Sequence, residues 1–333
     1  MPKHLGDAVL CLGALRLLAA VPGSRVRLVC PSQLILDLLA DQGSWQRGSA
    51  AFVSAKYSVA VLLAPSMRVA LAARKAGLRQ LIGLPSDGRG WLLSQRVAGP
   101  DQALPSQGLP SLLPGEHQAD AYERVARHVV QSLVGTERFG PADRRYTLGA
   151  PGRDRGRDAW LSTGRPTLLL HPYSAGLATK RWAMNDWLEL GRLLRSAKAR
   201  PIVTGGPGDE DYRLAAELGT ALEAPVLAGD STLSPAAWVS LADCVGRQLL
   251  CDTGLAHLAA AAGLEPIVLF GPTDPARHAP SGGTVVWGGR DLSCAPCYRS
   301  PCAAALPHAC MGHDPDEVAG LLKLRAGPPP GAV

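Results

Sequence analysis

The chain has 333 residues, of which 47% are hydrophobic and 19% charged, a composition that suits folded domains and excludes a largely disordered protein. The formal net charge of +6 favours acidic ligands, but the basic residues are dispersed and only 5% of residues are aromatic, which argues against nucleic-acid binding. No run of about 18 uninterrupted apolar residues occurs, so a membrane-spanning helix is not expected.

The first half of the chain alternates helix-like and strand-like segments, the pattern of an α/β domain. The expected helices cover residues 7–20, 34–40, 67–77 and 117–135, and the expected strands cover 25–30, 58–63 and 79–84. We assign residues 1–145 to a Rossmann-like domain. Residues 146–165 are rich in Pro, Gly and charge, and we interpret them as a linker region.

Short apolar strands then alternate with helices again, which predicts a parallel sheet covered on both faces. The expected strands are 167–171, 201–205, 224–229, 248–252 and 266–271, and the expected helices include 185–199 and 234–244. We assign residues 166–325 to a second Rossmann-like domain and residues 326–333 to a disordered tail. Ligands of such sheets gather at the carboxyl ends of the strands. This rule places one group of residues along a common edge: His171, Gly205, Gly206, Asp252 and Gly271.

The segment CDTGLAHLAAAAG, residues 251–263, joins a strand to a helix of small residues. One interpretation is a simple turn with Asp252 or Thr253 as the helix N-cap. The other is an anion site, because the first turn of a helix offers unpaired N–H groups and Gly254 has no side chain to keep a phosphate away. His257, one turn into the helix, could reach the same anion or could be a packing residue.

Two further segments follow strand ends in the second domain. HPYSAGLATKRW contains Lys180, which can neutralise a pyrophosphate, although a solvated basic pair with Trp182 in the core is the alternative. GGPGDED contains Asp209 and Glu210, and an acid at this place can accept hydrogen bonds from ribose hydroxyls. Acids are also simply enriched at helix N-termini.

The eight cysteines fall into two groups. Cys11, Cys30, Cys244 and Cys251 stand singly in apolar surroundings, where reduced, buried thiols are expected. The other four are clustered, with His308 and His313 as reserve ligands: Cys294, Cys297, Cys302 and Cys310. They could complete a tetrahedral Zn or Fe site, or could be four reduced thiols in a loop.

The N-terminus has a basic start and an apolar middle, as a signal peptide does. Gly6, Asp7 and Arg16 interrupt that middle, so we expect an amphipathic helix of a cytoplasmic protein.

Four segments together resemble glycosyltransferase family 9, the ADP-heptose:lipopolysaccharide heptosyltransferases: HPYSAGLATKRW, TGGPGDE, CDTGLAHLAAAAG and FGPTDPARHAP. The opening HLGDAVLCLGALRLL is similar to the family's Gly-Asp loop and first helix. The resemblance implies a GT-B fold, in which two Rossmann-like domains face a cleft. The first domain would bind the acceptor and the second the nucleotide sugar. The implied reaction is inverting transfer of a heptose from ADP-heptose to a hydroxyl of a lipopolysaccharide core or related glycan.

The resemblance also implies roles for individual residues. Asp7 would be the general base that deprotonates the acceptor, with a helix N-cap as its alternative role. Lys180 would hold donor phosphate and Glu210 or Asp209 the ribose. The residues toward the pyrophosphate and sugar would be Asp252, Thr253, Gly254 and His257. No cofactor is required for such a transfer. A similar cysteine-rich segment holds iron in the protein-modifying members of the family, so we expect a structural Fe or Zn at the four cysteines.

One departure concerns the start of the chain. Family members usually begin with a strand before the Gly-Asp loop, but only MPKHL precedes Gly6. Either the start codon has been placed late or the first strand is absent.

Several alternatives to the heptosyltransferase reading stay open. The same fold could use another nucleotide sugar, or a protein or small-molecule acceptor, and a non-catalytic nucleotide-sugar-binding protein is the alternative from a different class. The expected partners are a nucleotide-sugar donor and a glycan, lipid-linked or protein acceptor, with no nucleic acid. The basic surface would allow peripheral contact with the inner face of the membrane.

Overall fold

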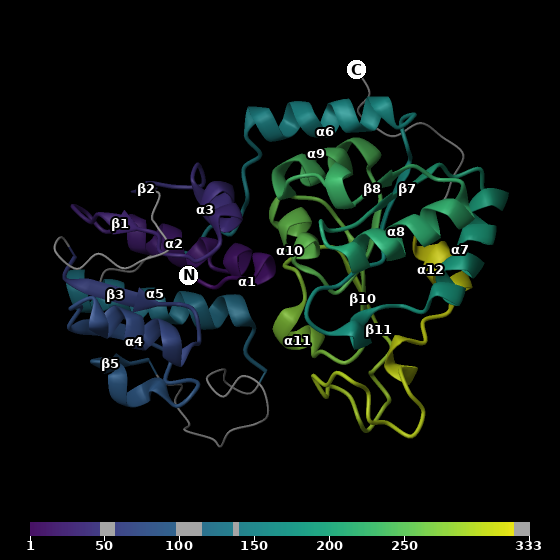
Figure 1. The fold of residues 1–333 in the computed structure, drawn as a ribbon. Coiled ribbons are helices and arrows are strands. Elements are labelled where there is room, and N and C mark those ends of the chain that lie inside the picture. Colours follow the sequence, from purple (N-terminus) through teal and green to yellow (C-terminus); the bar gives the residue numbers. More distant parts are fainter. Residues whose placement is uncertain (47–56, 98–114, 136–139, 323–333) are drawn as a thin grey trace. The chain divides into compact units, whose positions relative to one another are not determined.

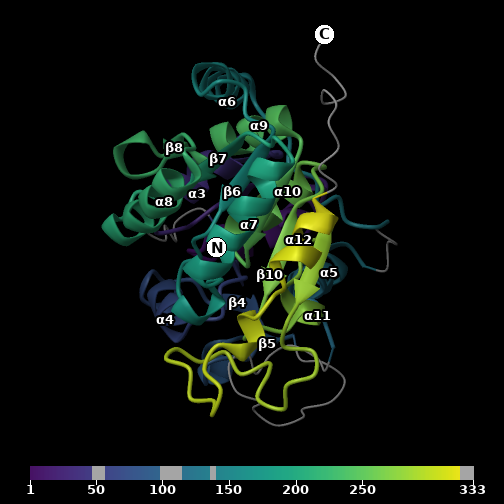
Figure 2. The same cartoon turned by 90° about the vertical axis from the view of Figure 1, so that its right-hand side faces the viewer.

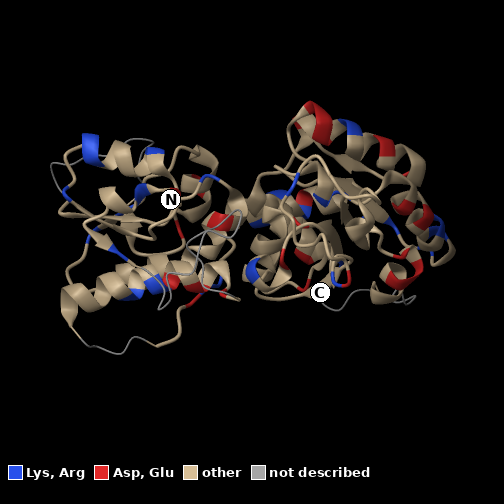
Figure 3. Ribbon diagram, turned by 90° about the horizontal axis from the view of Figure 1, so that it is seen from below, with Lys and Arg blue, Asp and Glu red and all other residues tan. Residues whose placement is uncertain are grey.

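The computed structural model describes residues 1–46, 57–97, 115–135 and 140–322. Contacts divide the chain into two compact units, Met1–Thr147 and Leu148–Val333. Each unit combines parallel strands with helices, which confirms the predicted α/β class (Figure 1). In both units Lys and Arg are spread among acidic residues (Figure 3). Within the described residues, no helix has both the length and the apolar character needed to cross a bilayer.

The first unit contains two small parallel sheets and five helices within its described residues. One sheet pairs β1 (Val26–Arg27) with β2 (Trp45–Gln46), and the other has the order β3 (Val59–Leu62), β4 (Gln80–Gly83), β5 (Gln95–Arg96). The helices are α1 (Leu5–Leu10), α2 (Leu12–Ala19), α3 (Gln33–Leu39), α4 (Met67–Lys75) and α5 (Gln118–Val134). The single helix expected over residues 7–20 is two helices that meet at Cys11. Residues 1–4 form no strand.

Alternating side chains explain how the larger of these sheets is covered. In β3 the side chains of Ala60 and Leu62 are buried in a core with Ala70 and Ala73 of α4. Helix α5 contacts β3 and β4, and α2 packs against α5. Both helices are amphipathic, so their apolar faces turn toward the sheet and toward each other.

The second unit is built on one six-stranded parallel sheet. Its strands are β6 (Leu168–His171), β7 (Pro201–Thr204), β8 (Val226–Leu227), β9 (Gln248–Cys251), β10 (Ile267–Phe270) and β11 (Thr284–Trp287). They lie in the order β8-β7-β6-β9-β10-β11, so the chain runs outward from β6 in one direction and outward from β9 in the other. This is the doubly wound order of a dinucleotide-binding fold. Strands β6, β7, β9 and β10 are fully or almost fully buried, as their unbroken apolar sequences predicted.

Helices cover both faces of this sheet (Figure 2). Helix α7 (Met184–Ser196) contacts α8 (Asp209–Leu222) and α12 (Pro315–Leu321), while α9 (Pro235–Val245) contacts α10 (Gly254–Ala261) and α6 (Ala150–Ser162). The short α11 (Pro275–His278) follows β10. Trp187 and Leu190 of α7 and Leu218 of α8 form a core with the strands.

The sequence suggested residues 146–165 as a linker region. Most of them form helix α6, and residues 148–165 belong to the second unit. Gly156 allows α6 to pack against α9, because a Cβ there would lie 2.3 Å from the Cβ of Ser240 in α9. The Ser240 hydroxyl donates a 2.7 Å hydrogen bond to the backbone oxygen of Arg153. The many Pro, Gly and charged residues concealed a helix that is stabilised by this close contact. The expected tail, residues 326–333, lies outside the described residues.

Candidate functional site

The topology of the second unit points to one place on its sheet. Strands β6 and β9 are neighbours and parallel, but the chain leaves them toward opposite faces, into α7 after β6 and α10 after β9. Ligands of doubly wound sheets bind at the carboxyl ends of the strands, at this switch point. His171 ends β6 and Asp252 directly follows β9, so the predicted edge runs through the switch point.

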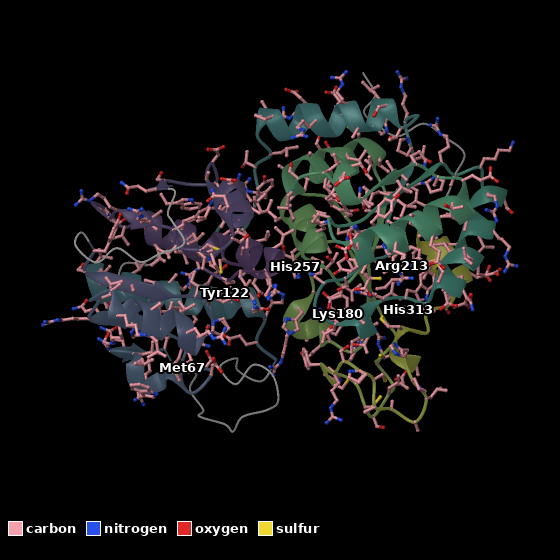
Figure 4. The ribbon with its side chains drawn as sticks, viewed as in Figure 1. Met67, Tyr122, Lys180, Arg213, His257 and His313 are labelled. Atoms are coloured by element: carbon pink, nitrogen blue, oxygen red, sulfur yellow. The ribbon has the colours of Figure 1, made fainter. Side chains whose placement is uncertain are left out.

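Three loops meet at Asp252. The Lys180 ammonium lies 2.8 Å from Asp252 Oδ2, and the Thr273 hydroxyl donates a 2.7 Å hydrogen bond to the same oxygen. The Ser174 hydroxyl donates to the Asp252 backbone oxygen at 2.5 Å. Asp252 and Thr273 are buried, whereas Lys180 keeps 18% of its side chain exposed. The carboxylate therefore holds the lysine at the sheet edge with part of its charge accessible. Figure 4 labels Lys180 and His257 in this unit.

Helix α10 starts directly beside this cluster in sequence. Its N-cap, Thr253, has an extended backbone with φ −142° and ψ 159°, and the Thr253 side chain makes no capping hydrogen bond. The helix begins at Gly254, and its first turn offers backbone N–H donors and the positive end of the helix dipole. His257 is buried in the first turn, and both its packing role and its contact with an anion stay predictions.

The loop between β6 and α7 is tied to the start of α8 by an ion pair. The Arg181 guanidinium contacts both carboxylate oxygens of Glu210, at 2.6 and 3.2 Å, and lies 4.8 Å from the ring centre of Tyr173. The guanidinium lowers the pKa of Glu210. Asp209 is exposed as the first residue of α8. Both acids predicted to meet a ribose thus lie at one helix start, and Glu210 is anchored to the residue after Lys180.

Two glycines of the segment GGPGDED, Gly205 and Gly206, lie where the packing leaves no room for a side chain. A Cβ on Gly206 would lie 2.0 Å from Asp211 Oδ2, and one on Gly205 would lie 2.9 Å from the Asp211 backbone oxygen. Asp211 is a buried acid whose pKa is raised chiefly by its burial. The sequence analysis did not single out Asp211, although its place in the first turn of a helix after two glycines was a usable signal.

His171 is part of the buried sheet rather than of an exposed site. Its Nδ1 lies 3.0 Å from the Thr204 hydroxyl, which also accepts a 3.0 Å hydrogen bond from the Trp238 indole. Burial lowers the pKa of His171 to about 4. The ring is therefore neutral near pH 7, and its contacts connect β6, β7 and α9.

In the first unit, Asp7 lies in the first turn of α1. His4 occupies the N-cap position, so Asp7 is not the N-cap that one interpretation proposed. The Gln118 amide donates hydrogen bonds to Asp7 Oδ1 at 2.8 Å and to the Tyr122 hydroxyl at 2.7 Å. Burial raises the pKa of Tyr122, so the phenol stays protonated. Gln118 thus orients the Asp7 carboxylate, and nothing in its sequence context indicated this.

The four clustered cysteines are all free thiols. Cys294 is exposed, Cys297 and Cys302 are partly buried and Cys310 is buried. Burial raises the pKa of Cys310, and the other three cysteines raise it further, so each of them lies within electrostatic range of Cys310. Thiolates suit Zn or Fe. The described part of the chain nevertheless contains no group of three or more His, Cys, Asp or Glu residues close enough to hold a metal ion. A metal at this cluster therefore stays a prediction.

The reserve ligand His313 is also buried. Its Nε2 has no hydrogen-bond partner among the described residues, and its ring packs edge-on against Trp182 at 6.4 Å. Burial lowers the pKa of His313 to about 4.

Comparison with known proteins decides the family. The model of glycosyltransferase family 9 (heptosyltransferase) matches residues 117–307, more than half of the chain. The chain belongs to glycosyltransferase family 9. A curated relative, lipopolysaccharide heptosyltransferase 1 of Pseudomonas aeruginosa, is 33% identical over 162 residues, which cover 47% of this chain. The match spans only 43% of that relative's length.

Solved structures of heptosyltransferases share the fold. The ADP-heptose lipopolysaccharide heptosyltransferase II of E. coli superimposes with a TM-score of 0.70 at 17% identity, covering 97% of this chain and 96% of its own. The E. coli heptosyltransferase WaaC with ADP gives 0.64 at 15% identity, with 96% and 94% covered. The iron-containing dodecameric glycosyltransferase TibC of enterotoxigenic E. coli gives 0.51 at 15% identity, with 97% and 74% covered. These matches confirm the predicted GT-B type of fold.

Placed on this family 9 fold, the predicted residues form two groups, one in each unit. The second unit brings Lys180, Asp252, Thr253 and Gly254 to one sheet edge, and Asp209 and Glu210 to the start of a neighbouring helix. Asp7 lies in the first unit with Gln118. Sequence reasoning missed Ser174 and Thr273. Thr273 lies in FGPTDPARHAP just after a buried strand, and that position was the available signal.

Proposed function

We propose that this family 9 chain is an inverting glycosyltransferase that transfers a heptose from ADP-heptose to a hydroxyl of a lipopolysaccharide core or related glycan. The observation that carries the proposal is the Lys180–Asp252–Thr273 cluster at the switch point of a doubly wound sheet, next to the uncapped start of α10. The related lipopolysaccharide heptosyltransferase 1 and ADP-heptose lipopolysaccharide heptosyltransferase II support the donor and the acceptor.

The donor side would hold a diphosphate. Lys180 has three N–H donors, of which Asp252 Oδ2 occupies one, so the others can reach phosphate oxygens. The N–H groups at the start of α10 would add donors, with Gly254 presenting no Cβ. As the bond between the anomeric carbon and the phosphate oxygen breaks, negative charge grows on the departing ADP. Fixed positive groups at this place stabilise the charge more in the transition state than in the ground state.

Glu210 and Asp209 are the two candidates for the ribose hydroxyls. Glu210 is held by both guanidinium nitrogens of Arg181, so a ribose contact would add to an oriented carboxylate. Asp209 is exposed at the first position of α8. We propose Glu210 as the ribose acceptor, because its orientation costs less entropy on binding.

Asp7 would act on the acceptor. Its carboxylate accepts the proton of the acceptor hydroxyl while that oxygen attacks the anomeric carbon on the face opposite the phosphate, which inverts the configuration. One C–O bond forms, one C–O bond to the diphosphate breaks, and the proton ends on Asp7. The Gln118 amide fixes Asp7 Oδ1 by a 2.8 Å hydrogen bond. This orientation is the contribution of the first unit.

We also propose that the four cysteines hold a structural Fe or Zn, with Cys294, Cys297, Cys302 and Cys310 as ligands. The electrostatic effect of the other three cysteines on Cys310 and an iron-containing protein of similar fold support this. The ligands would have to converge from their described positions, and no step of the transfer uses the metal. Elemental analysis of the purified protein tests it. Cys297→Ser should abolish the metal content and Cys244→Ser should leave it unchanged, whereas a metal-free native protein would refute the site.

We propose that the reaction takes place in the cytoplasm. All eight cysteines are free thiols, which fits a reducing, cytoplasmic compartment. A lipid-linked acceptor would then be met by peripheral contact at the inner face of the membrane.

Nucleotide release tests the function. The protein is incubated with a lipopolysaccharide core acceptor and, in separate reactions, ADP-heptose, a UDP-sugar or a GDP-sugar. We expect release of the nucleoside diphosphate in the reaction with ADP-heptose and not in the reactions with the UDP-sugar or the GDP-sugar. Release with another donor only would point to the same fold with a different sugar. ADP binding without any release would favour the non-catalytic alternative.

The base is tested with Asp7→Asn. This change keeps the size of the side chain and an oxygen that can accept the hydrogen bond from Gln118, but it removes the basic carboxylate. We expect turnover to fall by about 10²-fold or more while the Kd for ADP stays within about twofold, because the base acts on the acceptor. Asp37→Asn, at another acid of the first unit that is hydrogen-bonded to Gln33, is the matched control and should keep full activity. Normal turnover of Asp7→Asn would exclude Asp7 as the base.

A further inference from the structure

Residues 297–299 connect the two loops of the second unit that hold the side-chain partners of Asp252. We call this segment the clip. The loop after β6 contains Lys180, and the loop after β10 contains Thr273. Both side chains contact Asp252 Oδ2. The clip makes hydrogen bonds to each of these loops, beside the residues that contact Asp252.

Three of these hydrogen bonds join the clip to the loop that contains Thr273. The backbone N–H groups of Cys297 and Tyr298 donate to the Pro272 oxygen at 2.9 and 3.0 Å. The Tyr298 hydroxyl accepts a 3.3 Å hydrogen bond from the backbone N–H of Asp274. The residues on both sides of Thr273 are thus bonded to the clip, so this loop cannot shift away from the clip without breaking one of the bonds.

A fourth hydrogen bond joins the clip to the loop that contains Lys180. The Thr179 hydroxyl donates to the backbone oxygen of Arg299 at 2.7 Å. Thr179 is buried and directly precedes Lys180. The clip therefore connects the backbone beside Lys180 with the backbone on both sides of Thr273.

The central residue of the clip has an unfavourable backbone conformation. The φ of Tyr298 is +55°, in the left-handed region, where a residue with a side chain is disfavoured and glycine is preferred. The Tyr298 ring packs edge-on against His278 of α11, with 5.6 Å between the ring centres. Strained residues of this kind cluster at functional sites, where the surrounding contacts hold them in place. The strain at Tyr298 is therefore a reason to assign a role to its side chain, whose hydroxyl supplies the bond to Asp274.

From these contacts we infer that Tyr298 and Thr179 are positioning residues for the donor diphosphate. Through the clip they fix the distance between the loop that contains Lys180 and the loop that contains Thr273. Groups that are held in place before binding lose less conformational freedom when the phosphates arrive. The inference rests on the proposed function, because ADP is the ligand whose diphosphate these loops would hold. Neither side chain has to touch the nucleotide.

Calorimetric titration of the full chain with ADP tests the inference. Tyr298→Phe removes the hydroxyl and keeps the ring, and Thr179→Val removes the other hydroxyl with little change of shape. We expect each change to raise the Kd for ADP by about two- to tenfold, the range of one neutral hydrogen bond. The two connections act in series, so the double variant should bind ADP no more weakly than the weaker of the two single variants.

Two control variants keep the Kd for ADP within about twofold of the native value. Thr179→Ser retains the hydroxyl, so its bond to Arg299 can still form. Tyr57→Phe also removes a bonded tyrosine hydroxyl, but the partner is Gln46 in the first unit. Thr179→Ser that binds as weakly as Thr179→Val would assign the effect to side-chain packing and overturn the inference. So would a double variant whose effect is the product of the two single effects, since the two connections would then act separately.

Amide exchange of the ligand-free protein gives a second measurement, which does not depend on the nucleotide. Tyr298→Phe should speed exchange at Asp274 and in residues 172–180 by about two- to tenfold, because the clip then holds both loops less firmly. Unchanged exchange in residues 172–180 overturns the inference. A native protein that binds no ADP overturns the proposed function and the inference with it. Native binding together with native Kd values in Tyr298→Phe and Thr179→Val overturns the inference alone.

Discussion

Replacing Thr273 by Val is a sharp test of how the donor side is held. The Thr273 hydroxyl is buried and donates a 2.7 Å hydrogen bond to Asp252 Oδ2, the oxygen that also contacts Lys180. Val has nearly the same shape but no hydroxyl. A hydrogen bond to a charged group contributes about 1.5–3 kcal/mol, and its loss leaves a buried carboxylate less well satisfied. For a unit of this size we expect the Tm to fall by roughly 3–12 °C.

The matched control is Thr273→Ser, which keeps the hydroxyl and removes one methyl group. Its cost should be about 1 kcal/mol, the value of one buried CH₂ group. Chemical unfolding followed by circular dichroism gives both free energies of unfolding, and calorimetry gives both affinities for ADP. The Val variant should bind ADP more weakly than the Ser variant, because Lys180 is then held by fewer contacts. The hydroxyl does not support Asp252 if the Thr273→Val variant is as stable as the native protein. The same conclusion follows if Thr273→Ser loses as much unfolding free energy as Thr273→Val.

Three further variants test other parts of the second unit. Lys180→Ala should raise the Kd for ADP by about 10- to 150-fold, the value of a charge-assisted hydrogen bond, whereas the exposed control Lys75→Ala should leave it unchanged in calorimetry. Gly206→Ala should cost about 1–3 kcal/mol of unfolding free energy because its Cβ would lie 2.0 Å from an Asp211 oxygen, and Gly282→Ala, whose Cβ would meet only an ordinary 3.8 Å contact, should be near neutral. In the native state the pKa of His171 is about 4, below its ordinary value. Between these two pKa values the unfolded state binds more protons than the native state, so the free energy of unfolding decreases as the pH is lowered. From pH 7 to pH 5 this contribution is roughly 2 kcal/mol, and urea unfolding should show a smaller loss for His171→Gln; an equal loss would assign the pH dependence to other groups.

The repetitive part of the fold was predictable from sequence. The apolar strands of the second unit, such as Leu168–His171 and Ile267–Phe270, are continuous apolar runs, and burial on both faces demands that composition. The helix Ala150–Ser162 was not predictable in the same way. Its sequence has weak amphipathic character, and it is stabilised by packing of Gly156 against Ser240, a contact 84 positions apart that no local pattern reveals.

The sequence indicated which residues belong to the candidate site but not which of them contact one another. Asp252 and Gly254 were recognisable because they follow a strand end. Lys180 was recognisable as a basic residue in the loop after another strand, β6. The sequence could not show that Asp252 holds Lys180, because the two residues come together only through the order of β6 and β9 in the sheet. Gln118 was hidden for the same reason, since it reaches Asp7 from a helix more than a hundred residues away.

In the proposed function, the switch point of the second unit binds the diphosphate of a nucleotide. Hydrogen–deuterium exchange of the native protein, with and without saturating ADP, tests it most directly. We expect slower exchange in two segments, residues 172–180 after β6 and residues 252–257 at the start of α10. Unchanged exchange in both segments, or protection confined to other parts of the chain, would contradict it.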